Sequence, residues 1–263
     1  CLLEWSALLH VVIPLGMITA LSRTSLFRDV HVDLTYEHYA EKRLDYLPAF
    51  LAMPCNCLVN VGYILVGLYW LFWGGCIQER EESRYLREVF AVMAICYAPV
   101  QWTRLAALQR APAVLDQWVT LPIFAWVPVW IDYIEDLPRR WRPRRAAALE
   151  LCSVLSYGLA LAHEFGFEAA LACHVTYAVH KGVRVQVSHG DDRSRRHLLQ
   201  AMGSCAGFVG LKLLDHRLSE LWLFQRFTGH FWSKVCDVLQ FHYSFCFLTT
   251  VTRRAQSKAD KTS

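Results

Sequence analysis

Long apolar blocks recur along the whole sequence and limit most strongly the folds it can adopt. Each holds about 17 to 24 residues, close to the roughly 20 that a helix needs to cross about 30 Å of hydrocarbon. The blocks are Trp5–Leu21, Leu51–Trp73, Leu86–Leu105, Val114–Ile134, Ala146–Ala162, Glu168–Val187, Leu198–Leu214 and Thr228–Val251. Because a backbone in lipid must satisfy its own hydrogen bonds, segments of this length must be helices. The sequence therefore predicts an all-α, polytopic membrane helix bundle with about eight spans.

Composition supports this class, because apolar residues make up 55% of the chain and charged residues only 19%, against roughly 25% in soluble domains. No internal repeat or soluble domain boundary interrupts residues 1–263, so we expect a single integral membrane domain. The longest polar connection runs from about Ser22 to Phe50. Its stretch Val30–Asp45 mixes aromatic and charged residues, which is typical either of a segment lying in the membrane interface or of a solvated loop.

The placement of positive charge predicts the orientation of the chain. With eight spans, one side of the membrane receives about twice as many lysines and arginines as the other, and the richer side is expected to be cytoplasmic. Both termini then lie in the cytoplasm, and residues 252–263 form a short basic cytoplasmic tail. The run Leu137–Arg145 holds five arginines, which either set this topology or attract anionic lipid headgroups. The first block is followed by Ser22–Ser25 without a clear cleavage site, so we expect it to be retained.

The ten cysteines do not indicate a metal centre. Most lie inside the apolar blocks and none form a C-x-x-C pair, so small residues that pack helices against one another are the simpler interpretation. We therefore expect no bound metal and no cofactor. Membrane lipids are the expected partners, whereas nucleic acid is not, and no feature indicates a particular protein partner.

Ionisable residues concentrate in the last apolar block. His230, Lys234 and Asp237 follow the i, i+4, i+7 spacing of one helical face. Because a central charged residue costs about 2.5 to 3.5 kcal/mol on membrane-insertion scales, each needs a partner or a function. Lys234 and Asp237 can partly neutralise each other, and Asp116 in the fourth block is a candidate partner from across the bundle. This stripe is either a buried network that fixes helix packing or part of a ligand or catalytic pocket.

Three long strings of this sequence resemble the transmembrane protein 187 family. They are Leu47–Pro54, the stretch Val114-Leu115-Asp116-Gln117-Trp118 running on to Trp126, and Gly229–His242. The resemblance extends over nearly the whole chain. By this resemblance we expect a protein of the secretory pathway, with the Golgi as the expected compartment.

A more distant resemblance connects the chain to the CREST membrane hydrolases, the superfamily of alkaline ceramidases and progestin/adiponectin-type receptors. It rests on Asn56 and Asn60 in the second block, on Leu115-Asp116, and on Leu214-Asp215 followed by Gly229–Trp232. The resemblance implies one extra N-terminal helix plus a seven-helix CREST-like core. It also implies a zinc site with one histidine on the second core helix and a His-x-x-x-His pair on the last.

This chain departs from that zinc pattern. Of the pair it keeps only His230, since Lys234 stands at the second position, and the remaining ligand falls near Arg104 or Leu105, with Gln101 near the family's serine. A catalytic zinc needs about three protein ligands, and a protonated lysine repels the ion. The resemblance therefore implies a relative without the chemistry, in which the Lys234 ammonium replaces the charge of the metal and keeps Asp116 ionised.

The sequence thus favours a non-enzymatic membrane protein that binds lipid or a protein partner. One alternative is a zinc-dependent lipid-amide hydrolase with a rearranged site that uses His174, His216 or His242. A second alternative is a transporter or channel that uses the polar stripe. The candidate residues of the polar core are Asp116, His230, Lys234, Asp237, Gln101, Asn56 and Asn60.

Overall fold

The computed structural model describes residues 3–35, 39–74, 79–137 and 142–262, and every long element within these ranges is an α-helix. The helices are α1 (Trp5–Ser22), α2 (Pro54–Leu58), α3 (Val61–Phe72), α4 (Glu81–Ala107), α5 (Arg110–Asp136), α6 (Pro143–Ser156), α7 (Leu159–Ala162), α8 (Gly166–His189), α9 (Asp192–Leu213), α10 (Asp215–Leu218) and α11 (Gly229–Thr262). Short 3-10 turns lie at Ser25–Phe27, Ala49–Leu51 and Trp222–Phe224. The predicted all-α class is confirmed.

Helices occupy each of the eight apolar blocks, although two blocks are divided. The second block contains α2 and α3, and the fifth contains α6 and α7. Pro54 begins α2, where its missing N–H costs nothing because the first turn of a helix has no internal acceptor. The last helix runs past its apolar block to Thr262, so the basic tail is helical as well.

Five helical segments are long and apolar enough to cross a membrane: α1, Pro54–Phe72, α4, α5 and Pro143–Ala162. Helices α8, α9 and α11 reach 24, 22 and 34 residues, but they do not meet the same criterion of apolar composition within the described residues. The chain is therefore a polytopic helical membrane protein. The count of eight spans remains a prediction.

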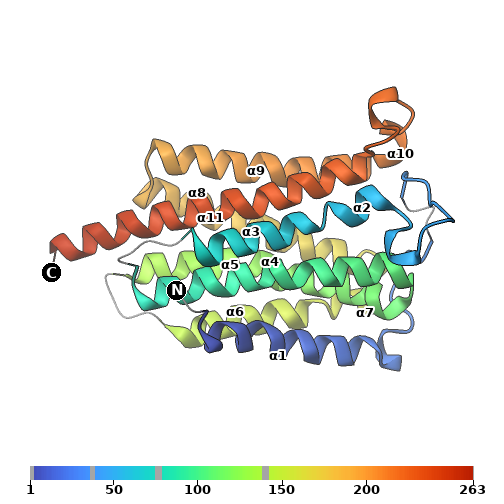
Figure 1. Cartoon of the computed structure of the whole chain (residues 1–263). Coiled ribbons are helices and arrows are strands. Elements are labelled where there is room, and N and C mark those ends of the chain that lie inside the picture. Colours follow the sequence, from blue (N-terminus) through green and yellow to red (C-terminus); the bar gives the residue numbers. More distant parts are fainter. Residues whose placement is uncertain (1–2, 36–38, 75–78, 138–141, 263) are drawn as a thin grey trace.

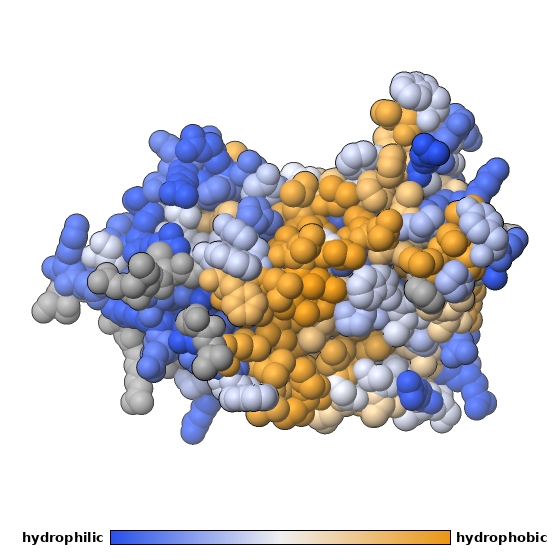
Figure 2. Space-filling view, viewed as in Figure 1, coloured by the Kyte–Doolittle hydropathy of each residue, from blue (hydrophilic) through white to orange (hydrophobic). Residues whose placement is uncertain are grey.

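The long helices lie side by side in one elongated bundle, with both termini toward the same end (Figure 1). Helix α11 packs along α9 and also contacts α3 and α5, whereas α1 packs against α4 and α5. The core is rich in aromatic side chains, with Trp126, Trp130 and Phe245 fully buried. Figure 2 shows an apolar belt around the middle of the visible face, between two polar ends. This pattern matches a bundle that meets hydrocarbon at its waist and water at its ends.

The connection between α1 and α2 folds back onto the bundle. Tyr39 and Glu41 are both buried, and the Glu41 carboxylate accepts hydrogen bonds of 2.8 Å from the backbone N–H groups of Cys55 and Asn56 in the first turn of α2. Burial raises the pKa of the Glu41 carboxyl, although these two bonds oppose the shift. In the described part of Val30–Asp45, Tyr39 and Glu41 complete the packing at one end of the helices, whereas Asp33, Lys42 and Asp45 are exposed. Whether this stretch lies in the membrane interface or is a solvated loop remains open.

Candidate functional site

A cluster of polar side chains lies inside the bundle where α3, α4, α5 and α11 meet. We call this cluster the polar core; its members are Tyr63, Tyr97, Gln101, Arg104, Asp116, Thr120, Lys234 and Asp237. Four of them were candidates from the sequence: Gln101, Asp116, Lys234 and Asp237. The structure brings these four into one region because α4 and α5 pack against each other and α11 packs across α3 and α5.

Asp116 is held by α4, the helix that precedes its own. The Arg104 guanidinium lies 3.0 Å from one carboxylate oxygen, and the Gln101 amide donates to the other. The Tyr97 hydroxyl donates to that second oxygen at 3.3 Å. The sequence offers Asp116 as a candidate partner for the stripe on the last helix, whereas the ion pair of Asp116 within the described residues is with Arg104. That the Lys234 ammonium keeps Asp116 ionised remains a prediction.

The stripe of His230, Lys234 and Asp237 faces the interior along α11, and all three side chains are buried. Asp237 accepts a hydrogen bond of 2.5 Å from the hydroxyl of Tyr63, which is itself fully buried on α3. Asp237 therefore has a partner from another helix, and no ion pair joins it to Lys234 among the described residues. The Tyr63 hydroxyl thus stabilises the buried Asp237 carboxylate. From the sequence alone, Lys234 is the expected partner of this carboxylate.

Lys234 differs from every other member of the polar core. Its ammonium lies 5.3 Å from the ring centre of Tyr97 and about the same distance from two further rings, 5.9 Å from Tyr63 and 6.0 Å from Phe208. Within the described residues, no carboxylate or hydrogen-bond acceptor pairs with it. The side chain is only 6% exposed. Cation–π contacts stabilise such an ammonium in part, and no ion pair adds to them in the part of the chain that the structure describes.

A cap closes the polar core at the start of α11. The backbone N–H of His230 donates to Asp215 at 2.6 Å, and the second oxygen of the same carboxylate accepts from the Ala40 N–H at 2.9 Å. The ring of Tyr39 packs edge-on against the His230 imidazole, with 4.8 Å between the ring centres. Asp215 thereby ties the α1–α2 connection to α11. Sequence reasoning did not find this role, because the two backbone groups lie 175 and 15 residues away along the chain.

Asn56 and Asn60 mark the break between α2 and α3. The Asn60 amide donates to the Asn56 carbonyl at 2.9 Å, whereas neither amide atom of Asn56, nor the side-chain oxygen of Asn60, has a hydrogen-bond partner. Within the described residues, these two asparagines make no hydrogen bond to Asp116, Lys234 or Asp237. They are buried polar groups in the same part of the bundle, not members of one connected network.

The donor set does not fit the zinc that the CREST resemblance implies. No group of three or more His, Cys, Asp and Glu side chains in the described ranges has the arrangement to hold a metal ion. Near His230, the places of the other ligands belong to cationic Lys234 and to Arg104, which is engaged with Asp116. Two histidines of the rearranged alternative are engaged elsewhere: His174 with Ser153 at 2.9 Å and His242 with the Trp70 indole at 3.4 Å. We therefore derive no step through a metal.

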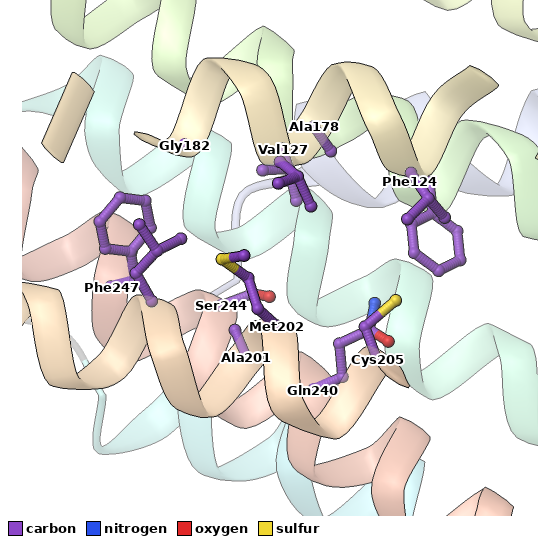
Figure 3. A pocket seen from close by; sticks show the side chains of 13 residues that line it. Phe124, Val127, Ala178, Gly182, Ala201, Met202, Cys205, Gln240, Ser244 and Phe247 are labelled. Atoms are coloured by element: carbon purple, nitrogen blue, oxygen red, sulfur yellow. The ribbon is translucent and has the colours of Figure 1, made fainter. Parts of the chain in front are cut away.

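A small cavity lies nearby, between α5, α8, α9 and α11, and Figure 3 shows its lining from Phe124, Met202, Phe247 and their neighbours. Its volume is about 60 Å³, which is room for one or two water molecules. The side-chain oxygen of Gln240 on this wall has no hydrogen-bond partner. The cavity is too small for a lipid chain, so it is not a candidate for the main ligand site.

Comparison with known proteins places the chain in a family. The model of the TMEM187 protein family matches residues 7–249, which include every candidate residue of the polar core. The chain belongs to the TMEM187 protein family. It is 51% identical to human transmembrane protein 187 over 247 residues, 94% of this chain and 93% of the human protein. It is 49% identical to the bovine protein of the same name over 249 residues, 93% and 96% of the two chains.

Membership of the TMEM187 family confirms the first resemblance and the description of the chain as a multi-pass membrane protein. It does not show that the chain belongs to the CREST superfamily, so that relation remains a resemblance. No solved structure matches this chain.

Proposed function

We propose that this chain is an eight-span, non-hydrolytic relative of the CREST proteins that binds an anionic lipid through Lys234. The lipid presents a carboxylate or a phosphate to the ammonium, and its apolar part lies among the helices. Both chemistries offer oxygen acceptors with negative charge, which is what an ammonium with unused donors requires.

The buried Lys234 side chain carries this proposal, because its ammonium has no ion pair within the described residues. Moving an ion of this size out of water costs several kcal/mol, and an ion pair with good geometry offsets that cost. The neighbouring carboxylates do not supply the pair, since Asp116 is bound to Arg104 and Asp237 to Tyr63. Three aromatic rings form an apolar wall around the ammonium. An anionic head entering from the membrane completes the coordination that the chain leaves open.

The expected membrane arrangement supports a lipid as the ligand. Eight crossings return both termini to one side, in agreement with their common end in Figure 1. The bias of lysine and arginine makes that side cytoplasmic. Helices α8, α9 and α11 then cross the bilayer, and α11 does so with Lys234 and Asp237 facing protein. We place the chain in membranes of the secretory pathway, in the Golgi by family resemblance.

The test combines metal content with native mass spectrometry of protein purified in mild detergent. The variants are His230→Ala, Lys234→Met and the matched control Lys261→Met, which removes an exposed lysine from the same helix. We expect no stoichiometric zinc in the wild type, and a bound fatty acid or anionic phospholipid that drops about tenfold in Lys234→Met, the scale of one charge-assisted hydrogen bond. The control should retain the lipid.

Two results would overturn this function. Stoichiometric zinc that disappears in His230→Ala would restore the hydrolase and direct attention to lipid amides. Equal occupancy by anionic lipid in Lys234→Met and Lys261→Met would show that the ammonium does not bind the headgroup. Adding fatty acid or phosphatidic acid separately to delipidated protein distinguishes a carboxylate ligand from a phosphate ligand.

A further inference from the structure

A larger cavity lies on the opposite side of α5 from α9, between α1, α4, α5 and α6. Its volume is about 310 Å³, and its walls are almost entirely apolar. Ligand pockets in proteins begin at about 300 Å³, and about ten groups the size of a water molecule fit this space. The cavity is therefore large enough for part of a lipid, unlike the small cavity beside Gln240.

One end of this cavity is polar. Apart from the Cys96 thiol, the ionisable side chains among the described lining residues are His10 on α1 and Glu150 on α6. The His10 imidazole Nε2 lies 2.8 Å from a Glu150 carboxylate oxygen. The other ring nitrogen lies 2.6 Å from the hydroxyl of Tyr85 on α4. The second carboxylate oxygen of Glu150 has no partner among the described residues. The end of an otherwise apolar cavity thus holds a hydrogen-bond acceptor without a donor.

The cavity opens sideways from the bundle. Leu151 lines it and is nevertheless 59% exposed, and the lining residues Pro14 and Ala147 are exposed as well. Helices α1 and α6 both pack against α5, and the opening lies between them. Because both helices belong to segments that are apolar enough to span a membrane, this mouth faces hydrocarbon. A molecule dissolved in the bilayer can enter without crossing water.

From this geometry we infer that the cavity between α1, α4, α5 and α6 is a binding site for an uncharged lipid that carries a hydroxyl group. The apolar body fills the cavity, and the hydroxyl donates to the free oxygen of Glu150. A carboxylate or phosphate head is disfavoured, because the Glu150 carboxylate would repel it. Sterols and diacylglycerols share this chemistry. The site is separate from Lys234 and depends on α1, the first helix of the bundle.

The experiment is photo-crosslinking of full-length protein in phosphatidylcholine nanodiscs. Two probes are used, a diazirine sterol and a diazirine diacylglycerol, each with its free hydroxyl. Val154→Trp fills the cavity from α6, and Leu155→Trp, one residue further on the exposed face of the same helix, is the matched control. We expect saturable labelling of α1 or α6 by at least one probe, lost in Val154→Trp and retained in Leu155→Trp. The probe that labels identifies the source of the hydroxyl.

A second arm needs no variant and therefore does not depend on the folding of a mutant. Unlabelled lipid should compete for the wild-type site about tenfold better than its O-methyl ether, because a hydrogen bond to a charged acceptor contributes on this scale. The inference is overturned if neither probe gives saturable labelling of α1 or α6. It is equally overturned if labelling is the same in both tryptophan variants, or if the ether competes as well as the free hydroxyl.

Discussion

Two buried lysines at opposite ends of the bundle have opposite surroundings. Lys181 on α8 is 4% exposed; its ammonium lies 2.6 Å from Asp132 and is also paired with Glu135. Lys234 on α11 is 6% exposed, and the contacts of its ammonium within the described residues are with three aromatic rings. The first lysine is satisfied within the protein, as expected for a structural ion pair. The second has no ion pair within the described residues, and the proposed function assigns it a lipid headgroup as its partner.

Lys181→Met should produce the largest effect. It leaves the buried Asp132 with the exposed Arg145, 3.1 Å away, in place of its buried lysine. Breaking a buried pair in this way costs up to about 3–5 kcal/mol of the free energy of unfolding. Thermal unfolding of detergent-purified protein measures the loss. The control is Arg184→Met on the same helix, whose exposed side chain lies 3.5 Å from Glu135 and should contribute about 0–1 kcal/mol. Similar losses in both variants would contradict a structural role for the Lys181 pair.

Lys234→Met should lower the free energy of unfolding by less than half as much as Lys181→Met in delipidated protein. No ion pair is broken, and removing an unpaired buried charge offsets part of the lost packing. Addition of anionic lipid should raise the unfolding temperature of the wild type but not of this variant, because a ligand stabilises only the state that binds it. A loss as large as that of Lys181→Met would mean that the two lysines are both structural.

Asn56→Leu tests whether a buried amide without hydrogen-bond partners lowers the free energy of unfolding. Asn56 lies at the same end of the bundle as Lys234. Both amide atoms of Asn56 are buried without partners, so a leucine of similar size should leave stability unchanged or raise it by about 1 kcal/mol. Asn60→Leu is the comparison, since it removes a hydrogen bond to the Asn56 carbonyl and should cost about 1 kcal/mol. The same unfolding assay ranks the two variants, and a large loss in Asn56→Leu would reveal a hydrogen bond to a ligand.

The smallest effect should appear in the dependence of stability on pH. The contributions of Asp191 and Glu41, which lie at opposite ends of the bundle, change with pH in opposite directions. Hydrogen bonds from Ser194 hold the pKa of Asp191, the N-cap of α9, below its usual value. Its stabilisation is therefore present above that value and is lost as the pH falls through the lowered pKa. Burial raises the pKa of Glu41, so its contribution falls as the pH rises above the usual value for glutamate.

Asp191→Asn and Glu41→Gln should flatten these two contributions separately. The measurement is the unfolding temperature of each variant and of the wild type across the acidic range. A wild-type profile that neither substitution changes would contradict both assignments.

Helical periodicity explains why part of the polar core could be predicted. His230, Lys234 and Asp237 share a face because their spacing is a property of one helix, and α11 indeed buries all three. The partners of these residues could not be predicted from helical periodicity. Arg104 reaches Asp116 across a helix hairpin, Tyr63 reaches Asp237 across 174 residues, and Tyr39 comes from a connection that the sequence left between two alternatives. Each contact depends on which helices become neighbours.

The sequence by itself determined that this chain is a helical, multi-pass membrane protein, because apolar length and backbone hydrogen bonding leave a segment in lipid no other structure. It also identified the family through strings that the family model then matched over residues 7–249. Only the tertiary structure decided which buried charges are paired. Within the described residues it leaves Lys234 without an ion pair and sets Glu150 at the end of an apolar cavity. The reason is that periodicity specifies the face of one helix, whereas pairing depends on distances between helices that lie far apart along the chain.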